Sequence, residues 1–131
     1  MVIAGTKLDL TKVEVPLFTV ATREDHIAPA ASVYRGAKLF SGPTEFVLAG
    51  SGHIAGIVNP PDKVKYQYWT DGASGAELSD WVKSAKEHPG SWWPYWSKWL
   101  EGHSGGWTIP RVPGQRLGVI EDAPGSYVKK R

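Results

Sequence analysis

Two short apolar runs, separated by a helical stretch, constrain the fold of this chain more than any other feature. The runs are Val15–Ala21 (VPLFTVA) and Thr44–Gly50 (TEFVLAG). Nearly continuous apolar runs of this length are typical of strands that are buried on both faces of a parallel sheet. Between them, Ala30–Phe40 spaces its apolar residues as a helix does, and Ser41-Gly42-Pro43 predicts the end of that helix. The sequence therefore predicts a βαβ unit with a right-handed crossover.

Beyond this unit, the sequence predicts three helices and no convincing further strand. The helices cover Lys63–Thr70, Ala76–His88 and Ser91–Gly102. Apolar residues of the second helix recur at i, i+3, i+4 and i+7. The third helix has Ser91 as its expected N-cap and Pro94 in its first turn. From Gly105 onward glycine and proline are frequent, so we expect an irregular tail.

These elements predict an α/β fold whose sheet is incomplete within this chain. A parallel pair of strands that is buried on both faces needs further strands beside it, and two strands alone are poorly stable. We therefore expect one segment of a larger domain, built in three parts. Residues 1–61 form the βαβ unit, residues 62–104 form Trp-rich helices, and residues 105–131 form the irregular tail.

The composition excludes several classes of function. The 131-residue chain has a net charge of only +2, so a nucleic-acid partner is not expected, and its basic end Lys129-Lys130-Arg131 is interpreted as a solvated tail. The absence of cysteine excludes disulfides and thiolate metal sites. No apolar run approaches the ~20 residues of a membrane-spanning helix, and the start MVIAGTKLDL lacks the layout of a signal peptide. We expect a cytoplasmic protein without a membrane span.

An acid and a histidine follow the two predicted strands. Asp25 comes four residues after the first strand, and His53 follows the second strand in a glycine-rich loop. The carboxyl ends of parallel strands share one edge of a sheet, so these side chains are predicted to lie within hydrogen-bond reach. A carboxylate that holds one imidazole nitrogen leaves the other free to accept a proton from a nucleophile. From spacing alone, a structural role for His53 stays open beside this catalytic one.

The nucleophile that such a pair would serve is missing. In α/β-hydrolases it precedes the acid and the histidine, on a Gly-x-Ser-x-Gly or Gly-x-Cys-x-Gly elbow, and this chain has neither motif. Ser51 does not fit the pattern and lies too close to His53 in the chain. The sequence therefore contains at most two members of a triad.

Other polar residues are given structural roles. His26 adjoins Asp25, but consecutive loop residues usually point apart, so we interpret it as a supporting group. Arg23 could contact a phosphate group, although a solvated turn with a local ion pair to Glu24 is favoured. His88 and His103 have no carboxylate partner in a suitable pattern, so no metal site is expected.

The tryptophans of the third predicted helix form an aromatic cluster. Trp92, Trp96 and Trp99 fall near one helical face, with Trp93 offset from it. A row of aromatic rings could bind a polymer, but packing against the α/β body is the favoured interpretation because each indole buries a large area.

Four motifs resemble the C-terminal part of class I polyhydroxyalkanoate synthases. They are TREDHIAP, GSGHIAGIVNPP, HPGSWWPYWSKWL and EDAPGSYVKKR, in this order, and the resemblance covers the chain from about Leu8 to its end. Members of this family polymerise (R)-3-hydroxyacyl groups from coenzyme A thioesters into polyester. The resemblance implies an α/β-hydrolase fold and a Cys-Asp-His triad, with its aspartate at Asp25 and its histidine at His53.

The cysteine of that triad lies upstream, on an elbow that this sequence does not contain. The resemblance therefore implies an acyltransferase segment that is inactive alone, and a fragment, a truncated gene and one piece of a split enzyme stay open. Expected partners are the 3-hydroxyacyl-CoA, the polyester chain, and the remainder of the synthase or a synthase homodimer; no cofactor is expected. Two alternatives remain: an inactive stand-alone module that binds intact synthase or the polymer granule, and a fragment of another α/β-hydrolase such as an esterase or depolymerase.

Overall fold

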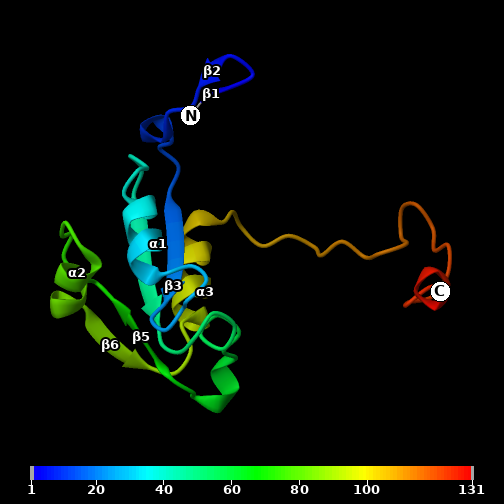
Figure 1. Cartoon of the computed structure of the whole chain (residues 1–131). Helices are drawn as coiled ribbons and strands as arrows, with labels where there is room; N and C mark the ends of the chain where they lie inside the picture. The colour runs from blue at the N-terminus through cyan, green and yellow to red at the C-terminus, as the bar shows by residue number, and fades with distance from the viewer. Residues whose placement is uncertain (1, 131) are drawn as a thin grey trace.

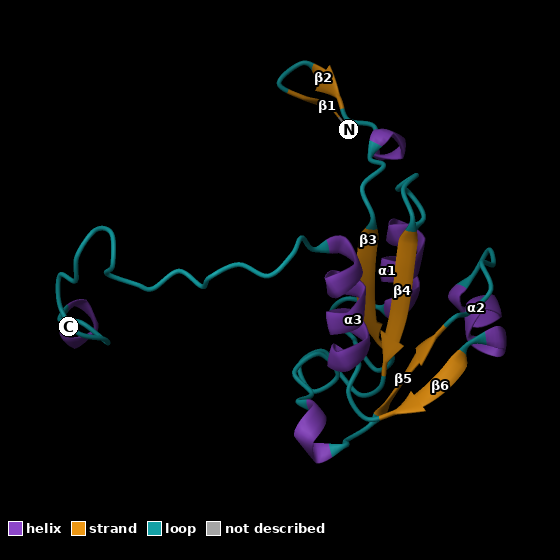
Figure 2. Ribbon diagram, turned by 180° about the vertical axis from the view of Figure 1, so that it is seen from behind, coloured by secondary structure: helices purple, strands orange, loops and turns teal. Residues whose placement is uncertain are grey.

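A four-stranded mixed sheet forms the centre of the molecule (Figures 1 and 2). We describe it from a computed structural model, which covers residues 2–130. The sheet has the order β3-β4-β5-β6. Its strands are β3 (Leu17–Thr22), β4 (Thr44–Ala49), β5 (Gln67–Thr70) and β6 (Lys86–Pro89). The strands β3 and β4 are parallel, whereas the pairs β4–β5 and β5–β6 are antiparallel.

The predicted βαβ unit is confirmed. The helix α1 (Ala30–Ala37) connects β3 to β4, and the two strands pair in register from Leu17↔Thr44 to Thr22↔Ala49. Both strands therefore end at the same edge of the sheet, which brings together the loops that follow them. Within the described residues, β3 pairs with a neighbour on one side only, so it forms an edge of the sheet.

One face of the sheet packs against α1 and α2 (Leu78–Ser84). Alternate residues of β4 point to opposite faces, and Phe46 and Leu48 point to this one. The rings of Tyr34, Phe46 and Trp81 form its aromatic centre, with Phe46 and Trp81 edge to face at 5.0 Å. These contacts fix α2 against the sheet although the helix has only seven residues.

The other face packs against α3 (Trp93–His103). Val47 and Ala49 of β4 meet Trp92, which is 7% exposed. The third predicted helix is thus confirmed, with Pro94 in its first turn as expected. Its buried face differs from the prediction, because Trp96 is 40% exposed while Trp92 lies in the core. Ser91 lies one position before the N-cap, and its hydroxyl accepts a hydrogen bond from the Trp93 amide.

Two of the predicted helices are wrong in whole or in part. Residues 63–70 do not form a helix: a 3₁₀ turn ends at Lys63 and β5 follows. The helix predicted for Ala76–His88 ends at Ser84, because Ala85 is extended and β6 begins at Lys86. The expectation of only two strands is therefore corrected, and residues 62–104 contain strands as well as helices.

Both ends of the chain extend away from this body (Figure 1). At the N-terminal end, β1 (Val2–Ile3) and β2 (Thr6–Lys7) form a small hairpin, followed by a 3₁₀ turn at Leu10–Lys12. The tail after Ser104 is irregular, as predicted, apart from a 3₁₀ turn at Tyr127–Lys129. Lys129 and Lys130 are exposed there, whereas Arg131 of the basic end lies outside the described residues. No helix in residues 2–130 is long and apolar enough to cross a membrane.

Candidate active site

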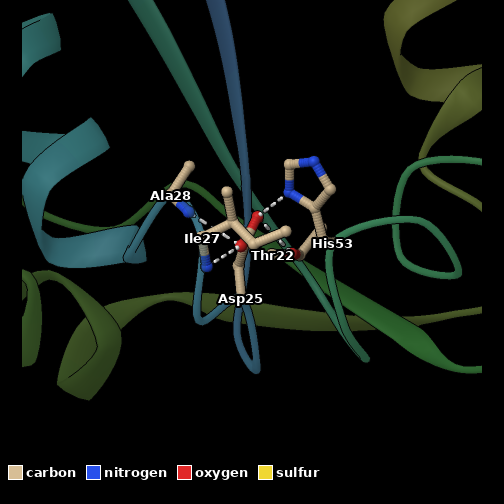
Figure 3. Close-up of polar contacts among 5 residues, drawn as sticks. All are labelled: Thr22, Asp25, Ile27, Ala28 and His53. Atoms are coloured by element: carbon tan, nitrogen blue, oxygen red, sulfur yellow. Dashed lines mark hydrogen bonds and ion pairs between the residues drawn. The ribbon is translucent and has the colours of Figure 1, made fainter.

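The loop that follows β3 presents Asp25 through a local turn (Figure 3). The Oδ1 atom of Asp25 accepts hydrogen bonds from the backbone amides of Ile27 and Ala28, both at 2.8 Å. An aspartate that binds amides two and three residues ahead is a common device for fixing a turn. The Asp25 side chain is only 7% exposed. Its second oxygen, Oδ2, remains for another partner.

That partner is His53. Its Nδ1 atom lies 2.7 Å from Oδ2 of Asp25, so the two residues meet as the sequence predicted. An ionised carboxylate only accepts hydrogen bonds, so Nδ1 must carry the donated proton. In the neutral imidazole, Nε2 is then the free acceptor. Figure 3 shows this second nitrogen pointing away from Asp25, and the His53 side chain is 44% exposed.

Hydrogen bonds keep Asp25 ionised. The amide of Ala28 contributes most to lowering its pKa to about 2, and His53 and the amide of Ile27 lower it further against the opposing effect of burial. The carboxylate is therefore charged throughout the physiological pH range. A fixed negative charge beside Nδ1 stabilises the imidazolium that forms when Nε2 takes up a proton.

Backbone contacts join the loops that carry the acid and the histidine. The amide of Arg23 donates to the carbonyl of Ala49 at 2.8 Å, and the amide of Glu24 donates to the carbonyl of Ser51 at 3.0 Å. These bonds continue the parallel pairing past the ends of β3 and β4. The short distance between Asp25 and His53 therefore follows from the strand register.

The remaining residues singled out from the sequence lie outside this pair. His26 is exposed and makes no hydrogen bond within the described residues. The Arg23 guanidinium lies over the Trp69 ring at 5.2 Å, and the ion pair expected with Glu24 is not among those of residues 2–130. His88 contacts the Thr70 hydroxyl, and His103 contacts the Trp99 carbonyl. No group of three or more His, Asp or Glu side chains in the described part is placed to hold a metal ion.

Two neighbours of the pair, Thr22 and Gly56, were not predicted from the sequence. Thr22, the last residue of β3, is 1% exposed, and its hydroxyl lies 3.4 Å from Oδ2 of Asp25. Gly56, three residues after His53, packs so closely against Thr22 that a Cβ atom there would lie 2.5 Å from the Thr22 methyl carbon. A polar residue at the end of an apolar run was a signal for Thr22, whereas nothing in the sequence placed Gly56 beside it.

Comparison with known proteins gives a consistent match along the whole chain. The chain is 53% identical to the poly(3-hydroxyalkanoate) polymerase subunit PhaC of Rhizobium etli, over all of this chain and 21% of that protein. It is 51% identical to the corresponding subunit of Rhizobium meliloti and 41% identical to that of Cupriavidus necator, which it covers to 21% and 23%. No protein-family model matches the chain.

These matches confirm the resemblance to polyhydroxyalkanoate synthases that the four motifs indicated. The chain spans about a fifth of the length of the curated relatives that it matches. This chain is thus homologous, along its whole length, to a segment of the poly(3-hydroxyalkanoate) polymerases.

Proposed function

We propose that this chain is the part of a polyhydroxyalkanoate synthase that supplies the acid and the base of a Cys-Asp-His triad. The whole enzyme would be a cytoplasmic, granule-associated acyltransferase that polymerises (R)-3-hydroxyacyl-CoA and releases coenzyme A. The 2.7 Å contact between His53 and Asp25, at the carboxyl edge of two parallel strands, carries the proposal. The order of strand, acid, strand and histidine also supports an α/β-hydrolase fold for the whole enzyme.

In the proposed reaction, Nε2 of His53 accepts the proton of a cysteine thiol that the remainder of the synthase supplies. The thiolate attacks the thioester carbonyl, the bond between that carbon and the sulfur of coenzyme A breaks, and the acyl group is transferred to the cysteine. The proton on His53 passes to the departing coenzyme A thiolate. The hydroxyl of a second monomer or of the growing chain then gives its proton to His53 and attacks the new thioester. An ester forms, the bond between the acyl carbon and the cysteine sulfur breaks, and the cysteine leaves as a thiolate.

Asp25 has an orienting and electrostatic role in this scheme. Both of its oxygens are held by groups of the protein, so the carboxylate cannot turn away from His53. Because its pKa is lowered to about 2, Asp25 stays ionised while His53 alternates between neutral and protonated. Asp25 therefore fixes the tautomer that leaves Nε2 free.

A chimeric polymerase tests the proposal. This chain replaces the matching segment of the Rhizobium etli polymerase, and coenzyme A release from (R)-3-hydroxybutyryl-CoA is measured. His53→Gln is expected to lower kcat by about 10³-fold, because a positioned general base contributes 10²–10⁴-fold. His26→Gln is the matched control and is expected to keep activity, since His26 is exposed and unpaired within the described residues. Full activity of the His53→Gln chimera would refute the proposed role.

The exposed tail favours a second function, in which an inactive module binds intact synthase or the polymer granule. Trp107, Leu117 and Ile120 are at least 94% exposed. Binding to another molecule would remove these apolar side chains from water, which is favourable. Binding of the purified chain to granules from a strain with intact synthase, lost when residues 105–131 are removed, would support this function over the first.

A further inference from the structure

The loop that carries His53 is held by contacts from outside as well as by its own turns. It runs from Ser51 to Asn59 and contains neither a strand nor a helix. Inside it, the amide of Gly56 donates to the carbonyl of Gly52 at 2.9 Å, and the amide of Val58 donates to Ile54 at 2.8 Å. Such isolated turns are weak by themselves, so the position of His53 depends on what the loop packs against.

Two consecutive indoles at the start of α3 bind this loop. Nε1 of Trp92 donates to the carbonyl of Gly56 at 3.1 Å, and Nε1 of Trp93 donates to the carbonyl of Ile57 at 2.9 Å. Trp92 is 7% exposed, and its bond to Gly56 is buried. Two adjacent residues of one element thus hold two adjacent carbonyls of a segment 36 residues earlier in the chain.

The carbonyl that Trp92 holds belongs to Gly56, which packs closely against the end of β3. A Cβ atom on Gly56 would lie 2.5 Å from Thr22 Cγ2 and 2.5 Å from the carbonyl oxygen of Gly50. The loop therefore lies against Thr22 at the closest approach that glycine allows. Thr22 in turn contacts Asp25. A shift of Gly56 away from β3 would carry His53 away from its carboxylate.

We propose that Trp92 and Trp93 are positioning residues that hold the His53 loop against the end of β3. The inference rests on the proposed function for its catalytic consequence, but the holding of the loop is a property of this chain by itself. The indole N–H groups, and not only the packed rings, hold the loop in place. Ring packing alone explains why Trp92 is buried beside Phe18 at 6.2 Å, but it does not explain two donors directed at successive carbonyls.

Replacement by phenylalanine separates these two roles, because it removes the donor and keeps an aromatic ring. The variants are Trp92→Phe, Trp93→Phe and the double variant. The matched control is Trp96→Phe on the same helix, whose indole makes no hydrogen bond within the described residues. Amide hydrogen exchange of residues 52–58 and the low-field Nδ1 proton signal of His53 are measured by NMR in this chain.

Loss of one hydrogen bond of ordinary net strength is expected to speed opening of the loop about fivefold, and loss of both about 25-fold. The His53 signal should broaden in the double variant, while amides of β3 and β4 exchange as in the unchanged chain. Trp93→Phe keeps the test valid if the buried Trp92 position does not tolerate phenylalanine. Loop exchange and a His53 signal equal to those of the Trp96→Phe control would overturn the inference.

The chimeric polymerase provides the catalytic readout. The double variant is expected to lower kcat about 10-fold with KM unchanged within about twofold, because a misplaced base affects the transition state and not substrate binding. A rise in KM of about 10-fold with kcat unchanged would contradict a positioning role. If His53→Gln left the chimera active, the proposed function would fail, whereas the exchange and NMR results would still decide whether the indoles hold the loop.

Discussion

One chemical change, glycine to alanine, is expected to have opposite effects at two positions of this fold. Gly36 is the last but one residue of α1, and a Cβ atom there would meet nothing within 4 Å. A Cβ atom on Gly72 would overlap the indole of Trp81. That indole has little room to move, because the Phe46 ring packs edge to face on it at 5.0 Å and the Tyr34 ring lies at 6.5 Å.

The magnitudes follow from these surroundings. Alanine in place of a helical glycine stabilises by about 0.5–1 kcal/mol, and the lower end applies to Gly36 because it lies near the helix end. Overpacking a closed core costs about 1–3 kcal/mol, and the upper half applies to Gly72 because aromatic rings confine Trp81. With a urea dependence of about 1.5 kcal/mol per M, the unfolding midpoint should rise by about 0.3 M for Gly36→Ala and fall by about 1.3–2 M for Gly72→Ala.

Urea titrations followed by far-ultraviolet circular dichroism measure both midpoints with one protocol. The Gly36→Ala variant also controls for any general effect of the added methyl group on the unfolded chain. A Gly72→Ala midpoint equal to or above that of the unchanged chain would refute the packing of α2 and Trp81 against the sheet as described.

Two further predictions concern the acid and the tail. The Asp25 carboxyl should titrate with a pKa of about 2 in carbon-detected NMR, against an ordinary value of 3.8. Because the pKa is lower in the folded chain, the stability that this carboxylate contributes is complete above about pH 4 and is lost as the pH falls toward 2. The Asp25→Asn variant should lack that part of the pH dependence. A carboxyl that titrates near 3.8 would contradict the hydrogen bonds described. Ending the chain at Ser104 should leave the urea midpoint within about 0.3 M of the full chain, because Trp107, Leu117 and Ile120 contact no core; a larger loss of stability would show that the tail packs on the body.

The parts of the fold that the sequence predicted are those determined by local pattern. An apolar run followed by a helix and a second apolar run admits few arrangements, and β3, α1 and β4 follow it closely. The strand β6, in contrast, contains Lys86, Glu87, His88 and Pro89, none of which favours a strand. It is a strand because it pairs with β5, from Gln67↔Pro89 to Thr70↔Lys86. Pairing with β5 overrides the local propensity of these residues, and no short stretch of the sequence indicates that pairing.

In the candidate site, too, one part was predictable from local pattern and another was not. Asp25 and His53 were predictable because each follows a strand of a parallel pair, and parallel register brings the two ends together. The indole bonds were not predictable, because their acceptors are backbone carbonyls, which every residue has. The sequence places Trp92 and Trp93 on a helix, but only the folded chain shows that they reach Gly56 and Ile57.

Under the proposed function, the geometry of the pair also limits where the nucleophile can lie. One oxygen of Asp25 is occupied by two backbone amides, and the other contacts both His53 and the Thr22 hydroxyl, so the carboxylate offers no free site to a substrate group. The Nδ1 atom of His53 is occupied as well. Only Nε2 remains, and Figure 3 shows it pointing away from Asp25 on a side chain that is 44% exposed. If the proposed function holds, the thiol must come within roughly 2.6–3.2 Å of Nε2, and the segment that carries it would lie at the edge of the sheet where β3 and β4 end.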